Sequence, residues 1–230
     1  MTAEHNLFPR AMSLAVHELR TPVTVVSGYL RMLLREQGGP VTDKQRKMLE
    51  EAERSCSRIA ALVAEMSDLG KLEGGEFALA RQPFDLPALV AELASGMHEG
   101  EDRGVQLQLR GTDHSVMVTG DRARLGAAIK ALMHSALRER GEPGVIVVDC
   151  STITDTTPNW AVLAVGDESV IGALTTAART TPPAFDEWRG GLGVALPVAR
   201  RFIEAHGGHL WSADGAQSRA ASALRIPLGT

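Results

Sequence analysis

The chain has 230 residues, which suits one or two domains, and its hydrophobic content of 44% is sufficient for a buried core. The net charge of −4 gives no general affinity for nucleic acid, so no nucleic-acid partner is expected. No apolar run approaches the length that crosses a bilayer, and the N-terminus lacks a signal-peptide pattern, which predicts a cytoplasmic protein without a membrane segment. Cys56 and Cys150 form no metal or redox spacing, so we expect neither a metal site nor a disulfide framework.

Two long helices are predicted over residues 8–36 and 43–70, with a Gly-Pro turn at 37–40 between them and Thr42 or Asp43 as the next helix cap. Both helices carry apolar residues at heptad spacing, which is typical of a left-handed bundle. These residues are Val16, Leu19, Val23, Val26, Leu30 and Leu33 in the first helix and Leu49, Ala52, Cys56, Ile59, Val63 and Met66 in the second. A hairpin alone buries such a stripe poorly, so we expect a homodimer that forms a four-helix bundle.

Residues 70–75 interrupt the heptads and indicate a linker, which divides the chain into domains 1–74 and 75–230. The second domain mixes helical and alternating patterns, which predicts an α/β sandwich and an α+β multidomain chain overall. We expect helices over 86–97, 121–140 and 197–205, strands over 105–110, 115–119, 144–150, 160–165, 209–213 and 220–226, and a mobile loop over 172–190.

The segment His17-Glu18-Leu19-Arg20-Thr21-Pro22 combines groups that suit phosphate chemistry on an imidazole. Residues four apart share a helix face, so His17 and Thr21 point the same way, and His17 follows the seam residue Val16 and is expected to face outward. A carboxylate such as Glu18 can hold the proton on one ring nitrogen while the other nitrogen attacks a phosphate. Pro22 removes one N–H and bends the helix beside His17.

This hexapeptide resembles the phosphoacceptor motif of bacterial sensor histidine kinases. Residues 68–75 are similar to the exit from the second helix of that family, and Glu204-Ala205-His206-Gly207-Gly208 is similar to the end of its last helix, where we expect the glycines to cap the helix. The resemblance implies that His17 carries phosphate, that Glu18 assists and that Thr21 orients water for dephosphorylation. The second domain is similar to the ATP-binding domain shared by histidine kinases, gyrase-type ATPases and Hsp90-type chaperones.

The family uses two asparagines on one helix to handle Mg²⁺ and phosphate. The corresponding places hold Ala131 and Ser135, and neither side chain offers an amide oxygen, although Ser135 can hold a metal-bound water weakly. In the family, a basic residue usually follows the second asparagine by three positions, and Arg138 stands there, three positions after Ser135. Arg138 is interpreted equally well as an ordinary charged residue on the solvent-exposed face of the helix.

The family also uses an aspartate at a strand end to accept a hydrogen bond from the adenine amino group, followed by two glycines that admit the base. Asp167 fits the aspartate, while the glycine places hold Ser169 and Ile171, whose Cβ atoms fill that space.

The third feature of the family is a glycine-rich segment at a helix start, whose backbone N–H groups meet the phosphates. Counting back from His206 without a gap matches the three family glycines to Gly191, Gly193 and Ala195, and a register two residues earlier would match Arg189, Gly191 and Gly193. The resemblance therefore implies an ATP and Mg²⁺ site whose motifs are altered, and we expect weak or absent ATP binding.

Three functions remain open within two-component signalling. The preferred one is a protein that carries phosphate on His17, exchanges it with an aspartate of a response regulator receiver domain and binds ATP weakly or not at all. The alternatives are a fully active ATP-dependent kinase and a non-enzymatic dimeric scaffold. Only 16 residues precede His17, so the input is expected from a partner, such as an upstream kinase or sensor protein, or from a region removed from the chain.

Overall fold

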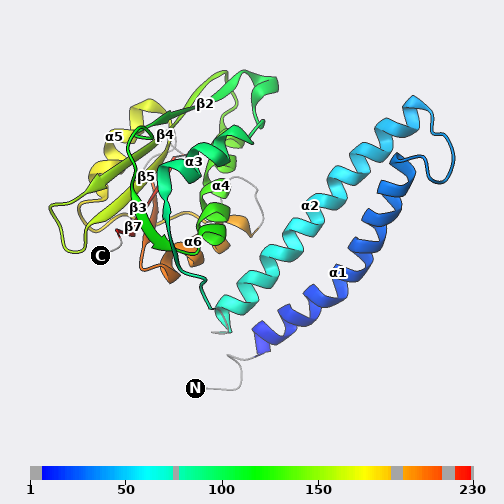
Figure 1. Ribbon diagram of the computed structural model, residues 1–230, viewed down its shortest axis with the longest axis horizontal. Coiled ribbons are helices and arrows are strands. Elements are labelled where there is room, and N and C mark those ends of the chain that lie inside the picture. The colour runs from blue at the N-terminus through cyan, green and yellow to red at the C-terminus, as the bar shows by residue number, and fades with distance from the viewer. Residues whose placement is uncertain (1–6, 75–77, 188–193, 214–220, 229–230) are drawn as a thin grey trace. The chain divides into compact units, whose positions relative to one another are not determined.

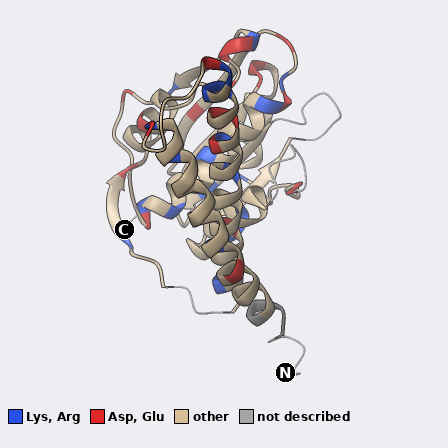
Figure 2. Ribbon diagram, turned by 90° about the vertical axis from the view of Figure 1, so that its right-hand side faces the viewer, with Lys and Arg blue, Asp and Glu red and all other residues tan. Residues whose placement is uncertain are grey.

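The computed structural model describes residues 7–74, 78–187, 194–213 and 221–228, and the chain forms two compact units, Met1–Phe77 and Ala78–Thr230 (Figure 1). Acidic and basic side chains are interspersed over the ribbon (Figure 2), in keeping with the small net charge. Within the described ranges, no helix has both the length and the apolar character that a bilayer crossing requires.

The first unit is the predicted helical hairpin, made of α1 (Leu7–Leu34) and α2 (Asp43–Glu73). Thr42 caps α2 through a capping box: its hydroxyl accepts the Gln45 N–H at 3.3 Å, while the Gln45 side chain accepts the Thr42 N–H at 2.9 Å. Arg46 donates to the carbonyl of Leu34 at 3.2 Å, which fastens the turn across the hairpin. The turn chemistry therefore sets where the second helix begins.

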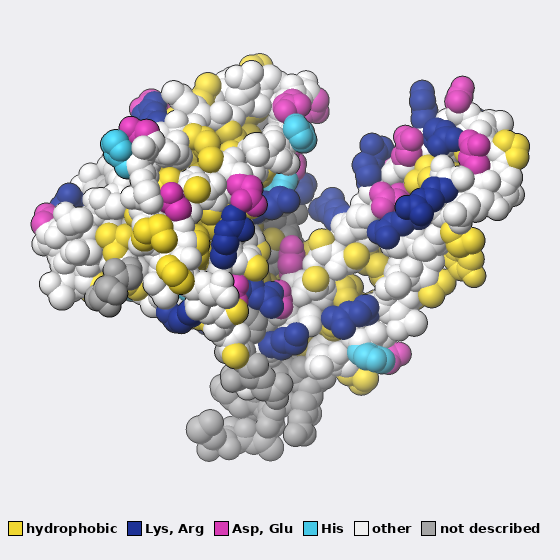
Figure 3. Space-filling view, viewed as in Figure 1, with side chains coloured by type: hydrophobic (Ala, Val, Ile, Leu, Met, Phe, Trp, Pro, Cys, Tyr) yellow, Lys and Arg dark blue, Asp and Glu magenta, His cyan; other side chains and the backbone are white. Residues whose placement is uncertain are grey.

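The predicted seam divides into a covered part and an open part. Val16, Cys56 and Val63 are buried between α1 and α2, with exposed fractions of 3%, 6% and 4%. Other seam residues remain exposed in the single chain, and these are Leu19, Val26, Leu33, Ala52 and Ile59. Hydrophobic side chains therefore reach the surface of the hairpin (Figure 3), and one chain covers only part of its own apolar stripe.

The second unit is the predicted α/β sandwich, built on a five-stranded sheet with strand order β2-β4-β5-β7-β6. Its strands are β2 (Val105–Arg110), β4 (Gly144–Ile153), β5 (Trp160–Gly166), β6 (His209–Ser212) and β7 (Ser222–Pro227), and its helices are α3 (Leu86–Ser95), α4 (Arg122–Glu139), α5 (Glu168–Ala177) and α6 (Ala195–Ala205). Strands β2 and β4 are parallel, and the other pairs are antiparallel. A separate two-stranded pair joins β1 (Gln82–Asp85) to β3 (Met117–Gly120), and β1 was not among the predicted strands.

The central strand β5 is buried on both faces along its whole length. Val162 and Ala164 belong to a core cluster that includes residues of α5. Since successive side chains alternate between faces, the equally buried Ala161 and Leu163 point to the opposite layer. Figure 1 shows α5 on one side of the sheet and α3, α4 and α6 on the other, which makes three layers.

The prediction of a loop over 172–190 is wrong for its first part, because α5 continues to Ala177. Ile171, Leu174 and Ala178 follow helical spacing and are buried against the sheet. The segment is rich in threonine, yet the hydroxyls of Thr175 and Thr176 donate to carbonyls three or four residues earlier and are satisfied within the helix. The polar composition therefore conceals a narrow apolar stripe.

Helix α6 ends as the Glu204–Gly208 segment predicted. The Gly208 N–H donates to the Ile203 carbonyl at 2.9 Å, and Gly207 has a φ of 76°, the left-handed conformation that favours glycine at this position. His206, 4% exposed, adds a second function: its Nε2 accepts the Asp121 N–H at 2.9 Å and its Nδ1 lies 2.6 Å from the Phe202 carbonyl. A neutral ring with the proton on Nδ1 satisfies both bonds, so His206 ties the end of α6 to the start of α4.

This arrangement predicts that the second unit loses stability in acid through His206. Burial is the main cause that lowers the pKa of His206 below its usual 6.5, so the native ring stays neutral while the unfolded chain takes up a proton. Stability is therefore lost as the pH falls below about 6.5, by at most about 1.4 kcal/mol for each pH unit. Urea unfolding at several pH values should show a weaker pH dependence for His206→Gln than for wild type.

His114→Gln is the matched control, because the His114 side chain is 85% exposed. Its pH dependence should equal that of wild type. An identical pH dependence for His206→Gln and wild type would contradict the role of the neutral ring.

Candidate phosphohistidine and nucleotide sites

The candidate phosphoacceptor His17 lies on α1 and points outward, with 76% of its side chain exposed. The buried neighbour Val16 fixes this orientation, because it anchors the opposite face of the same turn. The Nδ1 atom of His17 lies 3.3 Å from Oε1 of Glu18. A proton held on Nδ1 by the carboxylate leaves Nε2 with its lone pair free in solvent, which is the arrangement that attack on a phosphate needs.

Thr21 and Pro22 complete the surface beside His17. Thr21 lies one turn further along α1 and is exposed like His17, so the two side chains share a face. Pro22 is inside the helix and lacks the N–H that would pair with the carbonyl of Glu18. The structure thus brings His17, Glu18 and Thr21 together as expected, and their chemical roles stay predictions.

An apolar groove of about 370 Å³ begins directly after this site and runs between the two helices. It is lined by Pro22, Val23, Val26 and Leu30 of α1 and by Ala52, Ser55, Cys56 and Ile59 of α2. Cys56 is a free thiol, and its Sγ lies 3.1 Å from the Ser27 hydroxyl. The lining includes Val26 and Ile59 from the exposed part of the predicted heptad seam.

The predicted magnesium and phosphate residues of α4 offer little to a metal. Ser135 is fully buried, and its Oγ has no hydrogen-bond partner among the described residues. Ala131 has no polar atom on its side chain. Arg138 is close to Glu99, with Nε 3.8 Å from Oε1, and His134 Nδ1 lies 2.9 Å from the other oxygen of the same carboxylate. Arg138 is thus part of a surface cluster of charges rather than a cation without a partner.

The predicted adenine acceptor Asp167 follows β5, as the sequence indicates, but its carboxylate is already bonded. Arg140, the C-cap residue that follows α4, donates to Oδ1 of Asp167. Asp167 is also the N-cap residue of α5, yet its side chain makes no capping hydrogen bond, because it turns toward Arg140. Nothing in the sequence pattern marks Arg140 as part of this site.

The positions where the family has glycines to admit a base hold side chains of α5. Ile171 is 6% exposed and packs in the core cluster against the sheet, and Ser169 lies in the first turn of the same helix. Gly191 and Gly193 lie outside the described residues, whereas Ala195, the third position of the ungapped register, begins α6. At the described positions compared with the family, the side chains supply no amide oxygen, and the carboxylate of Asp167 is already paired with Arg140, so these positions do not match the way the family holds ATP and Mg²⁺.

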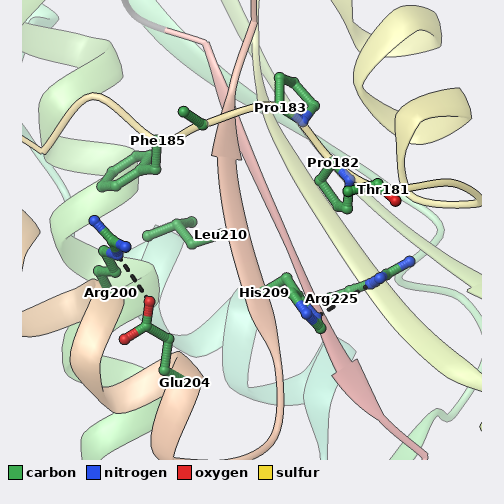
Figure 4. A pocket seen from close by; sticks show the side chains of 10 residues that line it. Thr181, Pro182, Pro183, Phe185, Arg200, Glu204, His209, Leu210 and Arg225 are labelled. Atoms are coloured by element: carbon green, nitrogen blue, oxygen red, sulfur yellow. Dashed lines mark hydrogen bonds and ion pairs between the residues drawn. The ribbon is translucent and has the colours of Figure 1, made fainter.

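A second cavity, of about 350 Å³, lies at the outer strand β6 (Figure 4). Its charged groups bond to one another: Arg200 Nε donates to Glu204 at 2.8 Å, and Arg225 Nε donates to His209 Nδ1 at 3.4 Å. Burial, followed by the neighbouring Arg225, lowers the pKa of His209, which keeps the ring neutral and able to accept this bond. The residues that line the cavity include none of those predicted for nucleotide.

Comparison with known proteins agrees with the site on α1. Residues 10–75 match the family model of the His Kinase A (phospho-acceptor) domain. The chain is 27% identical over 203 residues to the circadian input-output histidine kinase CikA of Synechococcus elongatus, and 28% identical over 202 residues to the signal transduction histidine-protein kinase BarA of Escherichia coli. The chain is therefore similar to bacterial sensor histidine kinases over most of its length. This similarity supports a role in two-component signal transduction.

The histidine kinase relatives are much longer than this chain. Each alignment covers 84% of the chain but 26% of CikA and 22% of BarA, so the chain spans about a quarter of their length. Two solved structures share the fold of the chain. Full-length ShkA in complex with AMPPNP has a TM-score of 0.70 at 20% identity, and the match covers 97% of this chain and 47% of the ShkA chain. The Acinetobacter baumannii histidine kinase AdeS has a TM-score of 0.60 at 19% identity, and the match covers 93% of this chain and 98% of the AdeS chain.

Proposed function

We propose that this protein carries phosphate on His17 and exchanges it with an aspartate of a response regulator receiver domain, while binding ATP weakly or not at all. The exposed imidazole of His17, with Glu18 at its Nδ1 atom, carries this proposal. In the accepting direction, Nε2 attacks the aspartyl phosphate, an N–P bond forms, and the P–O bond to the aspartate breaks and leaves its carboxylate. Transfer back reverses these steps.

The residues of the second unit support the proposal that ATP is bound weakly or not at all. Mg²⁺ and fixed donors offset the charge of a transferring phosphoryl group, and their loss removes most of the catalysis available to a kinase. Here Ala131 and Ser135 lack amide oxygens, and Asp167 is bonded to Arg140. A donor other than ATP, such as a phosphorylated regulator, an upstream kinase or a phosphorylated partner, then supplies the phosphate on His17.

The proposed active form is a homodimer, in which the groove on the hairpin is covered by a second copy. Its residues follow heptad spacing and include Val26, 49% exposed, and Ile59, 48% exposed. Burial of such side chains stabilises a four-helix bundle, and each contributes about 1.5–3 kcal/mol when fully covered. His17 remains outside this interface and accessible to a receiver domain.

Phosphate acceptance by His17 is the first test. Purified protein mixed with receiver domains that have been phosphorylated by labelled acetyl phosphate should become labelled with an acid-labile phosphate. His17→Ala should abolish the label, whereas His114→Ala, which removes another exposed histidine, should retain it. Label on wild type from γ-labelled ATP and Mg²⁺ alone would overturn the proposed weak nucleotide step, and no label from any receiver domain would overturn the transfer.

Thr21 should act on removal of phosphate rather than on its arrival. Because its hydroxyl shares the exposed face with His17, Thr21→Ala should slow dephosphorylation of the phosphorylated regulator about tenfold or more, without reducing label on His17. Thr24→Ala is the matched control, since the Thr24 hydroxyl donates to the Arg20 carbonyl at 2.8 Å instead of facing a partner. Equal rates for both variants would assign Thr21 to a surface role only.

The dimer interface is tested by one charge in the groove. Val26→Lys should yield a monomer in analytical ultracentrifugation at a concentration where wild type is dimeric, because a buried ammonium without a partner costs several kcal/mol. Val25→Lys is the control: Val25 is 50% exposed but does not line the groove, so this variant should remain dimeric. A dimeric Val26→Lys would place the interface elsewhere.

A further inference from the structure

The guanidinium of Arg140 lies in a notch built from the chain that follows α4. Its Nε donates to the Glu142 carbonyl at 3.2 Å, and one terminal nitrogen donates to the Pro143 carbonyl at 3.5 Å. Gly144 forms the floor of the notch, because a Cβ at this position would collide with the guanidinium. The remaining terminal nitrogen donates to Asp167. Three separate contacts therefore aim Arg140 at this one carboxylate.

A second arginine holds the next acidic residue in a different way. Arg110, at the end of β2, forms a two-point ion pair with Glu168 in the first turn of α5. The Arg110 side chain is 37% exposed and that of Glu168 65% exposed, whereas Arg140 is 24% and Asp167 36% exposed. Both arginines thus fasten the start of α5, but only Arg140 acts on the carboxylate at the end of β5.

We propose that Arg140 is a built-in occupant of the base-recognition carboxylate, so that a purine nucleotide binds this domain only by displacing the Arg140 guanidinium from Asp167. This inference rests on the proposed weak nucleotide binding and names its principal cause. It makes Arg140 the residue that decides whether the second unit accepts a nucleotide.

Arg140 blocks the site because its guanidinium and the adenine amino group compete for the same carboxylate, that of Asp167. The exocyclic amino group of adenine donates hydrogen bonds, as a guanidinium does, and both need the same acceptor. The arginine carries a full positive charge, so its bond to the carboxylate includes a Coulomb attraction that a neutral amino group does not supply. The pair is partly buried, with Arg140 24% and Asp167 36% exposed, so it is screened less than a fully exposed ion pair. A neutral base therefore loses this competition for Asp167.

The test is a gain of binding. Wild type, Arg140→Ala and Arg110→Ala are each titrated with the fluorescent nucleotide mant-ADP, as full chains. Arg140→Ala should bind at least about fivefold more tightly than wild type. Arg110→Ala removes an equal charge that is also paired with a residue at the start of α5, Glu168, and this variant should bind mant-ADP as wild type does. The double variant Arg140→Ala with Asp167→Asn should lose the gain, because the carboxylate that Arg140 releases is then absent.

Near-ultraviolet circular dichroism from Trp160 and Trp211, which are buried in the second unit, reports that this unit is folded in each variant. If Arg140→Ala binds mant-ADP no more tightly than wild type, Arg140 is not the occupant, and the proposed function stands unchanged. An equal gain in Arg110→Ala also overturns the inference, since it would mean a general effect of charge. Transfer from ATP to His17 in wild type would instead contradict the proposed function, whatever Arg140→Ala does.

Discussion

Burial of β5 on both faces is the constraint on which the second unit depends. A strand with seven buried residues needs an apolar layer on each side of the sheet, and α5 supplies one of them. Ile171 and Leu174 are the residues of α5 that cover it, and burial of each contributes about 1.5–3 kcal/mol. The helix begins immediately after Asp167, so the segment where the family needs small residues beside a base is the segment that this fold uses for its core.

This constraint also explains why the two acidic residues at the start of α5 are paired with arginines. A helix that begins on the end of a strand must be held in register with the sheet, and Arg110 and Arg140 come from β2 and from the end of α4 on either side of that point. Asp167 thereby becomes part of the framework of the unit. A carboxylate that stabilises a fold in this way is less available to a ligand, because any new partner must first replace the existing one.

Sequence reasoning predicted most of the framework, including the helix that carries the candidate phosphoacceptor His17, but not the contacts made by Asp167. The heptads of α1 and α2 have a strong period, β4 and β5 are rich in β-branched and other apolar residues, and the structure confirms a hairpin followed by a sandwich. The stripe of α5 was hidden among threonines, and β1 is a four-residue strand with a proline, too short for a pattern. The bond between Arg140 and Asp167 joins residues 27 apart in sequence, and no local pattern encodes it.

The two units therefore differ in which residues of the histidine kinase motifs they contain. On the hairpin, the polar residues His17, Glu18 and Thr21 are exposed and contribute nothing to the core, so a structural requirement does not explain their presence together. In the second unit, Ile171 is accounted for by packing in the core and Asp167 by an ion pair. A chain that needed only to fold or to dimerise could replace His17 freely, whereas a chain that receives phosphate from another protein could lose its own nucleotide contacts first. The proposed phosphotransfer function is the one that explains both halves of this pattern.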